Sequence, residues 1–190
     1  MPRDDDARAQ LIKGERIVDD GWQWIEDKAA GLEGLPDGDV IVPLALWQAE
    51  RAALLERDGG LGVWLDADEE PESIADDLQH FALIGLNFPV FHDGRGLSAA
   101  VLLRTRFGFT GELRALGDIR RDQMSYMHRC GIDAFRVPID ADPEQIMAGL
   151  EVMRDYYQGS VLVPEPLFRR IQRTFHQPGD QPGDQPSDRP

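Results

Sequence analysis

The chain alternates short apolar runs with segments of helical spacing, and this alternation constrains its fold more than any other feature. Strands that alternate with helices connect through right-handed crossovers and build a mostly parallel sheet. The sequence therefore predicts an α/β fold: an open, mostly parallel five-stranded sheet with helices on both faces. A partial β/α barrel is the alternative, because five units are too few to close an eight-stranded barrel. The apolar runs typical of buried strands are 40–44, 61–65, 82–88, 112–116 and 133–137.

Residues with capping preferences predict where the helices between these strands begin. Apolar residues at helical spacing over 45–57 predict the first helix, and Pro71 suits the first turn of the second. Ser98 is expected to cap a third helix, and Asp118 a fourth. A further helix is expected after Asp142, where a capping-box pattern precedes more apolar residues at helical spacing.

The length of 190 residues is typical of one domain. Residues 1–10 are charged and lack apolar periodicity, and 177–190 repeat Gln-Pro-Gly-Asp without a large apolar residue to bury. Neither segment can offset the entropy of ordering, so both are expected to be disordered tails. The prediction is a single α/β domain over 11–176.

The chain is strongly acidic, with a formal net charge of −15 at pH 7. Such a surface repels phosphate backbones and anionic lipids, so nucleic acids and membranes are poor partners. A basic patch on a partner protein is a better match, although the plainer interpretation is that the charge only keeps the protein soluble. The chain shows no run of about 20 apolar residues and no leader segment, which favours the cytoplasm.

A single cysteine, Cys130, excludes an internal disulfide and a cluster held by four cysteines. The four histidines form no pair at i, i+3 or i, i+4, so no metal site is predicted. The glycine patterns of dinucleotide-binding and P-loop proteins are absent, and the residues identify no cofactor. They also identify no catalytic residue and no oligomeric state, so whether the chain is an enzyme stays open.

Ligands of open α/β sheets bind outside the carboxyl ends of the strands, a rule that selects the loops 66–70, 87–96, 117–121 and 138–142. The loop 87–96 places two glycines around an arginine at the start of a helix. Free N–H groups there favour an anion that the arginine could pair with, and a plain Asp-Gly turn is the alternative. The candidate anion- or ligand-binding residues of this loop are Asn87, His92, Asp93, Gly94, Arg95 and Gly96.

The loop after the fourth strand supplies the other candidates. Asp118 is most simply a helix cap, whereas Arg120 in the first turn would oppose the helix dipole unless it met an anion or a carboxylate. Asp93 is one such carboxylate, and a surface pair with Asp122 is the alternative. Asp122 also shares a helix face with Arg129, which is typical of a salt-bridged surface. The candidates here are Gly117, Asp118, Arg120, Asp122, Gln123 and Arg129.

Two stretches of the chain, 41–47 and 76–135, resemble one bacterial family. The first reads IVPLALW, and the second includes FPVFHDGRG and GELRALGDIRRDQMSYMHRCGIDAF. They resemble the domain of unknown function 934 family, whose members carry the label of a probable oxidoreductase of sulfite reduction and are typically encoded beside an assimilatory sulfite reductase. The resemblance implies a role in sulfur assimilation. It carries over no catalytic residue, because the family has none established.

Three hypotheses about function follow. In the first, the chain is an accessory protein of assimilatory sulfite reduction that delivers, assembles or regulates at sulfite reductase, and its acidic surface docks on a basic patch. In the second, it is a small enzyme in which Arg95 and Arg120 hold an anionic substrate or phosphate-bearing cofactor, with Asp93 or Asp118 as acid or base. In the third, it is a scaffold whose loops contact another protein.

Overall fold

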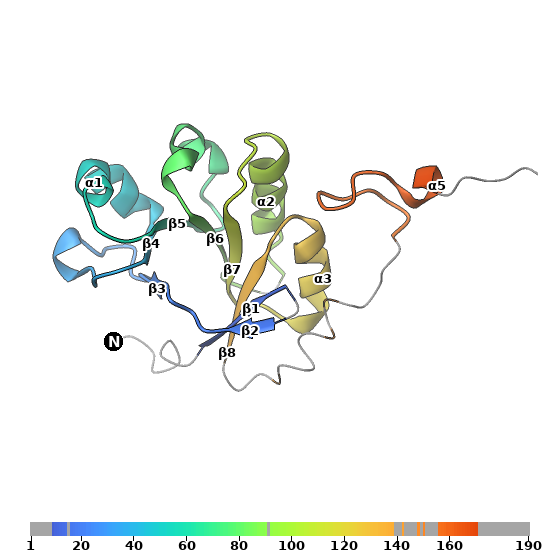
Figure 1. The fold of residues 1–190 in the computed structure, drawn as a ribbon, viewed down its shortest axis with the longest axis horizontal. Coiled ribbons are helices and arrows are strands. Elements are labelled where there is room, and N and C mark those ends of the chain that lie inside the picture. The colour runs from blue at the N-terminus through green and yellow to red at the C-terminus, as the bar shows by residue number, and fades with distance from the viewer. Residues whose placement is uncertain are drawn as a thin grey trace, which may run out of the picture.

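The computed structural model describes residues 9–14, 16–90, 92–138, 142, 148, 150 and 156–170. They form one curled sheet with helices along its outer face and a C-terminal arm that projects from the body (Figure 1). The strands are β1 (Ala9–Lys13), β2 (Arg16–Val18), β3 (Gln23–Trp24), β4 (Val40–Pro43), β5 (Leu61–Leu65), β6 (Leu83–Phe88), β7 (Glu112–Gly117) and β8 (Ala134–Pro138). The helices are η2 (Leu32–Gly34), α1 (Leu44–Leu55), η3 (Pro71–His80), α2 (Arg95–Thr105), α3 (Arg121–Arg129) and α5 (Leu167–Arg170).

All eight strands belong to one sheet, in the order β2-β1-β8-β7-β6-β5-β4-β3. Every neighbouring pair from β3 to β8 is parallel, whereas β1 runs antiparallel to both β2 and β8. The α/β class and the open, mostly parallel sheet are thus confirmed, and the five predicted strands are β4 to β8. The sheet has three strands more than the five predicted. One of them, β2, lies where residues 15–18 suggested a short edge strand or a hairpin with the segment around Trp22 and Trp24, but β2 pairs with β1 and β3 pairs with β4, so that hairpin does not form.

The helices cover the outer face of the sheet and not both faces as predicted. Strands β4 to β8 follow one another in space as they do in sequence, so each right-handed crossover places its helix on the same side. Accordingly, α1, η3, α2 and α3 share one hydrophobic core with the outward side chains of the strands. The arrangement is that of a partial barrel, the alternative that the sequence left open (Figure 1).

The inner face of the sheet carries a second, smaller hydrophobic cluster. The chain crosses from one edge of the sheet at β2 to the other edge at β3, and the tryptophans on this crossing pack against the inner face. Trp64 Nε1 donates to Ile25 O over 2.8 Å, and the rings of Trp24 and Trp64 meet edge to face. The N-terminal segment therefore covers the inner face of the sheet, which in a full barrel would be enclosed by further strands. The cluster consists of Ile41, Trp64, Leu83 and Leu116, with Trp22 and Trp24 against it.

Helix α2 begins four residues earlier than the capping pattern predicts. It starts at Arg95, so Ser98 lies inside the helix and does not cap it. The side chain of Asp93 instead bonds to the first turn of the helix, because its Oδ1 accepts the backbone N–H of Arg95 over 3.1 Å. A carboxylate at this place also suits the positive end of the helix dipole.

Helix α3 begins later than predicted, at Arg121, and Asp118 is not its cap. The backbone N–H of Asp118 donates to Phe88 O over 2.8 Å, which keeps Asp118 at the end of the sheet. The helix therefore starts beyond it, where Gln123 Oε1 accepts the backbone N–H of Arg120 over 3.4 Å.

Three further predictions concern the ends of the chain. Strand β1 begins at Ala9, two residues inside the segment expected as an N-terminal tail. The helix expected after Asp142 lies mostly outside the described residues, and so does the tail 177–190.

None of the helices among the described residues combines the length and the apolar run that crossing a bilayer requires.

Candidate functional site

The loops that follow β6 and β7 begin side by side. Phe88 is in register with Gly117, and its carbonyl oxygen accepts the N–H of Asp118. Because β5 is parallel to β6 as well, the loop 66–70 leaves the sheet at the same end. We call residues 66–70, 87–96 and 117–123 the strand-end rim. The structure thus brings the two loops with their candidate residues, Arg129 excepted, to one end of the sheet.

Two of the candidate glycines are required by close packing around Phe88. Gly117 has a φ of +94°, and a Cβ there would lie 2.5 Å from Phe88 O. A Cβ on Gly96, in the first turn of α2, would lie 2.8 Å from the Phe88 ring. Gly94 has more room, since a Cβ would be 3.8 Å from the nearest side-chain atom, of Leu97. Gly96 and Gly117 therefore serve the contact between α2 and the ends of β6 and β7.

Asn87 belongs to a polar cluster with Asp66, the first residue of the selected loop 66–70, and with Lys28, which the sequence did not single out. Asn87 Nδ2 donates to Asp66 Oδ1 over 3.0 Å, and Lys28 Nζ forms an ion pair with the same carboxylate. Burial raises the pKa of Asp66, but Lys28, the Ala67 N–H and Asn87 outweigh it and hold the pKa below its ordinary value. The hydrogen bond to Asp66 raises the pKa of Lys28. The lowered pKa makes the Asp66 carboxylate a weak base near neutral pH, and the raised pKa keeps Lys28 protonated, which does not suit a nucleophilic amine.

Arg95 is paired with Asp93 of its own loop. Arg95 Nη2 lies 2.6 Å from Asp93 Oδ2, and Nε lies 3.0 Å from Oδ1. The side-chain and backbone hydrogen bonds from Arg95 lower the pKa of Asp93 to about 2. The guanidinium that the sequence assigns to an anionic ligand thus already has a carboxylate partner.

Arg120 is likewise placed beside a carboxylate of its own loop. Its Nη2 lies 3.5 Å from Asp118 Oδ2. The predicted partners, Asp93 and Asp122, form no ion pair with Arg120 in the described part of the chain. Arg120 therefore meets a carboxylate, as expected, but it is that of Asp118, two residues away, because Asp93 pairs with Arg95.

The remaining candidates do not share one place. His92 is exposed in the turn before α2, and Asp122 and Gln123 lie in the first turn of α3 at the rim. Arg129 is the last residue of α3, so a rise of about 1.5 Å per residue puts it about 10 Å from Asp122 along the helix axis. Arg129 therefore belongs to the opposite end of the helix layer.

Arg129 lines a cavity of about 560 Å³ between α2, α3 and the segment 158–164. The cavity lies away from the strand-end rim, and no sequence motif marks it. Its walls come from three segments that only the fold brings together, so sequence reasoning could select Arg129 but not its surroundings. The lining residues are Val101, Thr105, Tyr126, Arg129, Cys130, Gln158, Gly159, Ser160, Val161 and Pro164.

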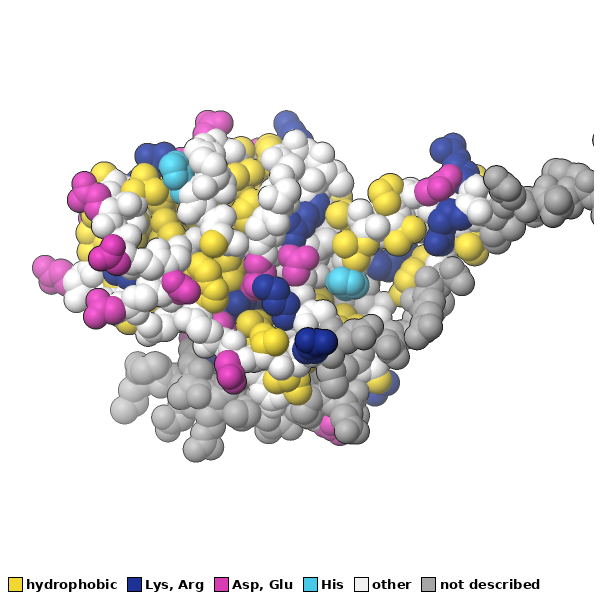
Figure 2. All heavy atoms as spheres, in the orientation of Figure 1, with side chains coloured by type: hydrophobic (Ala, Val, Ile, Leu, Met, Phe, Trp, Pro, Cys, Tyr) yellow, Lys and Arg dark blue, Asp and Glu magenta, His cyan; other side chains and the backbone are white. Residues whose placement is uncertain are grey.

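The segment 156–170 forms an arm that leaves the body beside α3 (Figure 1). Eight large apolar side chains are exposed among the described residues, and four of them belong to this arm, namely Tyr157, Leu162, Val163 and Phe168. Figure 2 shows hydrophobic side chains along the arm together with basic and acidic ones, and acidic side chains spread over the body on the same face. The arm is therefore the part of the described surface where apolar contact area is concentrated.

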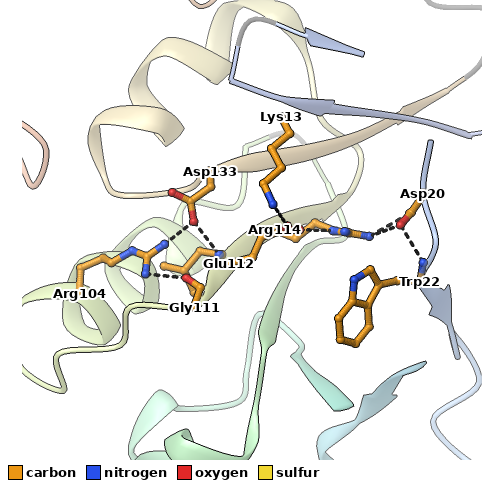
Figure 3. Close-up of polar contacts among 9 residues, drawn as sticks. Lys13, Asp20, Trp22, Arg104, Gly111, Glu112, Arg114 and Asp133 are labelled. Carbon is orange, nitrogen blue, oxygen red and sulfur yellow. Dashed lines mark hydrogen bonds and ion pairs between the residues drawn. The ribbon is translucent and has the colours of Figure 1, made fainter. Parts of the chain in front are cut away.

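Two arginine networks hold the body together (Figure 3). In the first, Arg114 on the inner face of β7 is 1% exposed, and its Nη1 lies 2.8 Å from both carboxylate oxygens of Asp20. Its Nε donates to Glu112 Oε1 over 2.7 Å, and Lys13 Nζ donates to Glu112 Oε2 over 2.8 Å. The network fixes the N-terminal segment over the inner face of the sheet.

The second network joins α2 to the start of β8. Arg104 forms an ion pair with Asp133, whose Oδ2 also accepts the backbone N–H of Leu113 over 2.9 Å. The same guanidinium donates to the carbonyl oxygens of Phe109, Gly111 and Gly131. Both arginines are compensated by carboxylates, so these networks are structural in character.

Acid is expected to weaken the first network through Glu112. Burial raises the pKa of Glu112, but Lys13 and Arg114 outweigh it and hold the pKa below its ordinary value. Such a carboxylate stabilises the fold above its unfolded-state pKa of about 4.3, and this contribution is lost as the pH falls through the folded-state pKa. The difference in unfolding free energy between the natural chain and Glu112→Gln should therefore shrink below about pH 4 in urea titrations. A difference that is the same at about pH 7 and about pH 3 would contradict this role.

No group of three histidine, cysteine, aspartate or glutamate side chains with metal-binding geometry occurs within the described ranges. One protein family matches more than half of the chain, over residues 62–168. This family is described as bacterial protein of unknown function (DUF934). The match extends from β5 through the strand-end rim and the walls of the cavity into the arm. No curated protein and no solved structure matches the chain.

Proposed function

The chain belongs to the bacterial family of unknown function DUF934, and from this premise we propose that it is an accessory protein of assimilatory sulfite reduction. Its C-terminal arm binds a partner protein, and sulfite reductase is the partner implied by the resemblance of 41–47 and 76–135. The observation that carries the proposal is the set of exposed apolar side chains on the arm.

The arm has the character of an interaction surface. Phe168 is 56% exposed and Tyr157 is more exposed still, and their rings contact each other with centroids 5.7 Å apart. Contiguous exposed apolar surface that is displayed away from a packed body is typical of protein contact sites. Burial of one such side chain contributes about 1.5–3 kcal/mol, so a few of them suffice for a specific contact.

The charges of the chain support electrostatic attraction to the partner, in addition to the apolar contact. The net charge of −15 favours approach to a basic surface of the partner, and such steering raises the association rate more than the affinity. Two arginines, Arg169 and Arg170, stand at the end of the arm itself. Salt is therefore expected to slow association, whereas the apolar side chains of the arm determine how long the complex lasts.

The strand-end rim favours this proposal over a small enzyme with an anionic substrate. Arg95 and Arg120, which would hold the anion, each lie beside a carboxylate of the same loop. The pKa of Asp93 is lowered to about 2, which makes it a poor base near neutral pH. An anion at this rim would meet guanidinium groups whose charge is already partly compensated by these aspartates.

Truncation of the arm's aromatic side chain should weaken partner binding. Phe168→Ala is expected to reduce the affinity for sulfite reductase about 30-fold, or about 2 kcal/mol, which is the size of a hot-spot effect. Binding is measured by calorimetry with the purified proteins and by co-purification of the tagged chain. The matched control is Leu55→Ala, because Leu55 is exposed (39%) on the body and should leave binding unchanged.

Two results would overturn the proposal. One is equal binding by Phe168→Ala and Leu55→Ala, which would remove the arm from the contact. The other is normal growth of a deletion strain with sulfite as its sulfur source, which would remove the chain from sulfite reduction altogether.

A further inference from the structure

We infer that the cavity between α2, α3 and residues 158–164 binds a small organic anion with an apolar body. Its volume of about 560 Å³ falls within the range of about 300–1,000 Å³ that small-molecule sites occupy. The inference does not rest on the proposed function: residues 158–164 of the arm form one wall of the cavity, but a ligand there would contact the side of the arm that faces α3 and not its exposed aromatic side chains.

The walls of the cavity combine apolar groups with one cation. Val101 of α2, Tyr126 of α3, and Val161 and Pro164 of the C-terminal segment supply apolar surface. The backbone N–H of Val161 donates to Arg129 O over 3.1 Å, so the segment is fastened to the end of α3. These walls suit the hydrocarbon part of a ligand, because apolar burial provides most of the affinity in such sites.

Arg129 supplies the anion-binding group. Its guanidinium contacts the Tyr156 ring, with Cζ 3.8 Å from the ring centroid, and Nη2 donates to Gln158 O over 3.2 Å. Its Nε is buried and has no hydrogen-bond acceptor, and no described carboxylate forms an ion pair with it. This is unexpected in a chain with 35 acidic and 20 basic residues, and an unpaired buried donor of a charged group is unfavourable. A carboxylate, sulfonate or phosphate group of a ligand would compensate the charge.

A purely structural role for Arg129 is the rival explanation. In that case its stacking on Tyr156 and its bond to Gln158 O would only attach the arm to α3. Both explanations predict that loss of Arg129 loosens the arm. They differ in whether the cavity prefers an anionic compound to a neutral compound of the same shape.

Cys130 gives the cavity a built-in reporter. It is the only cysteine of the chain, it lines the cavity, and it is 7% exposed. Burial raises the pKa of the Cys130 thiol, so it stays protonated near neutral pH and reacts slowly. Its alkylation by iodoacetamide, a small neutral reagent, should therefore depend on whether the cavity is filled.

The test compares two probes with the same ring skeleton on the full chain, 8-anilinonaphthalene-1-sulfonate and the neutral N-phenyl-1-naphthylamine. We expect the sulfonate to bind at least about tenfold more tightly in fluorescence titrations. We also expect saturating sulfonate to slow the alkylation of Cys130 several-fold. Equal affinities for the two probes, or a bound sulfonate that leaves Cys130 unprotected, would overturn the inference.

Variants test whether the preference for the sulfonate over the neutral probe depends on Arg129. Arg129→Met should bring the sulfonate affinity down about tenfold, to that of the neutral probe, while the control Arg121→Met at the exposed start of α3 keeps the preference. Thr105→Trp should fill the cavity and weaken both probes. If Arg129→Met loosens the arm so far that both probes are lost, Arg129→Lys decides: a retained preference for the sulfonate supports the inference, and equal binding of the two probes overturns it.

Discussion

Arg114→Met is expected to lower the free energy of unfolding by about 3–5 kcal/mol, the usual effect of breaking a buried ion pair by removing one partner. The Arg114 side chain is 1% exposed and pairs with Asp20 and Glu112. Its removal leaves Asp20 without its cation, whereas Glu112 keeps Lys13. Because Asp20 precedes Trp22 and Trp24, the loss should also release the segment that covers the inner face of the sheet.

Urea unfolding followed by tryptophan fluorescence measures this effect. The matched control is Arg106→Met, since Arg106 is 63% exposed and pairs with Glu72 over 3.2 Å at the surface. Exposed pairs contribute about 0–1 kcal/mol, so the control should unfold almost like the natural chain. Equal losses in the two variants would show that the Arg114 network does not hold the N-terminal segment in the way the contacts indicate.

Gly117→Ala is expected to cost about 3 kcal/mol or more, through two effects that add. The φ of +94° is unfavourable for any residue with a Cβ, and the new methyl group would lie 2.5 Å from Phe88 O. That oxygen belongs to the backbone of β6 and accepts the N–H of Asp118, so it has no rotamer by which to turn away. The strand-end rim should therefore open where the β6 and β7 loops begin.

Gly108→Ala separates the two effects. Gly108 has a φ of +66°, but a Cβ there would meet nothing within 4 Å. Its substitution should cost only the left-handed backbone penalty, about 1–2 kcal/mol. The additional loss of unfolding free energy in Gly117→Ala measures the steric contact with Phe88 O. If the two variants were equally stable, the end of the sheet would have moved to make room for the methyl group without loss of stability.

The strands could be predicted from the sequence because their side chains are buried on both faces. In β5 every residue from Leu61 to Leu65 is buried, and a parallel strand of this kind reads as an unbroken apolar run. The strand-end rule then placed Asn87, Asp93, Gly117 and Asp118 at one rim, where the structure has them. Lys28 was not predicted to join this rim, since it belongs to the segment between β3 and β4 and follows no motif.

The sequence by itself determined the parallel sheet, its five central strands and the loops that leave its carboxyl ends. These features depend on apolar periodicity and on backbone hydrogen bonds, which neighbouring residues express locally. Only the tertiary structure decided that α1, η3, α2 and α3 cover one face, that Arg95 and Arg120 lie beside aspartates of their own loops, and that Arg129 borders a cavity. Charge pairing and unfilled space depend on which distant segments meet, and no local pattern in the chain encodes that meeting.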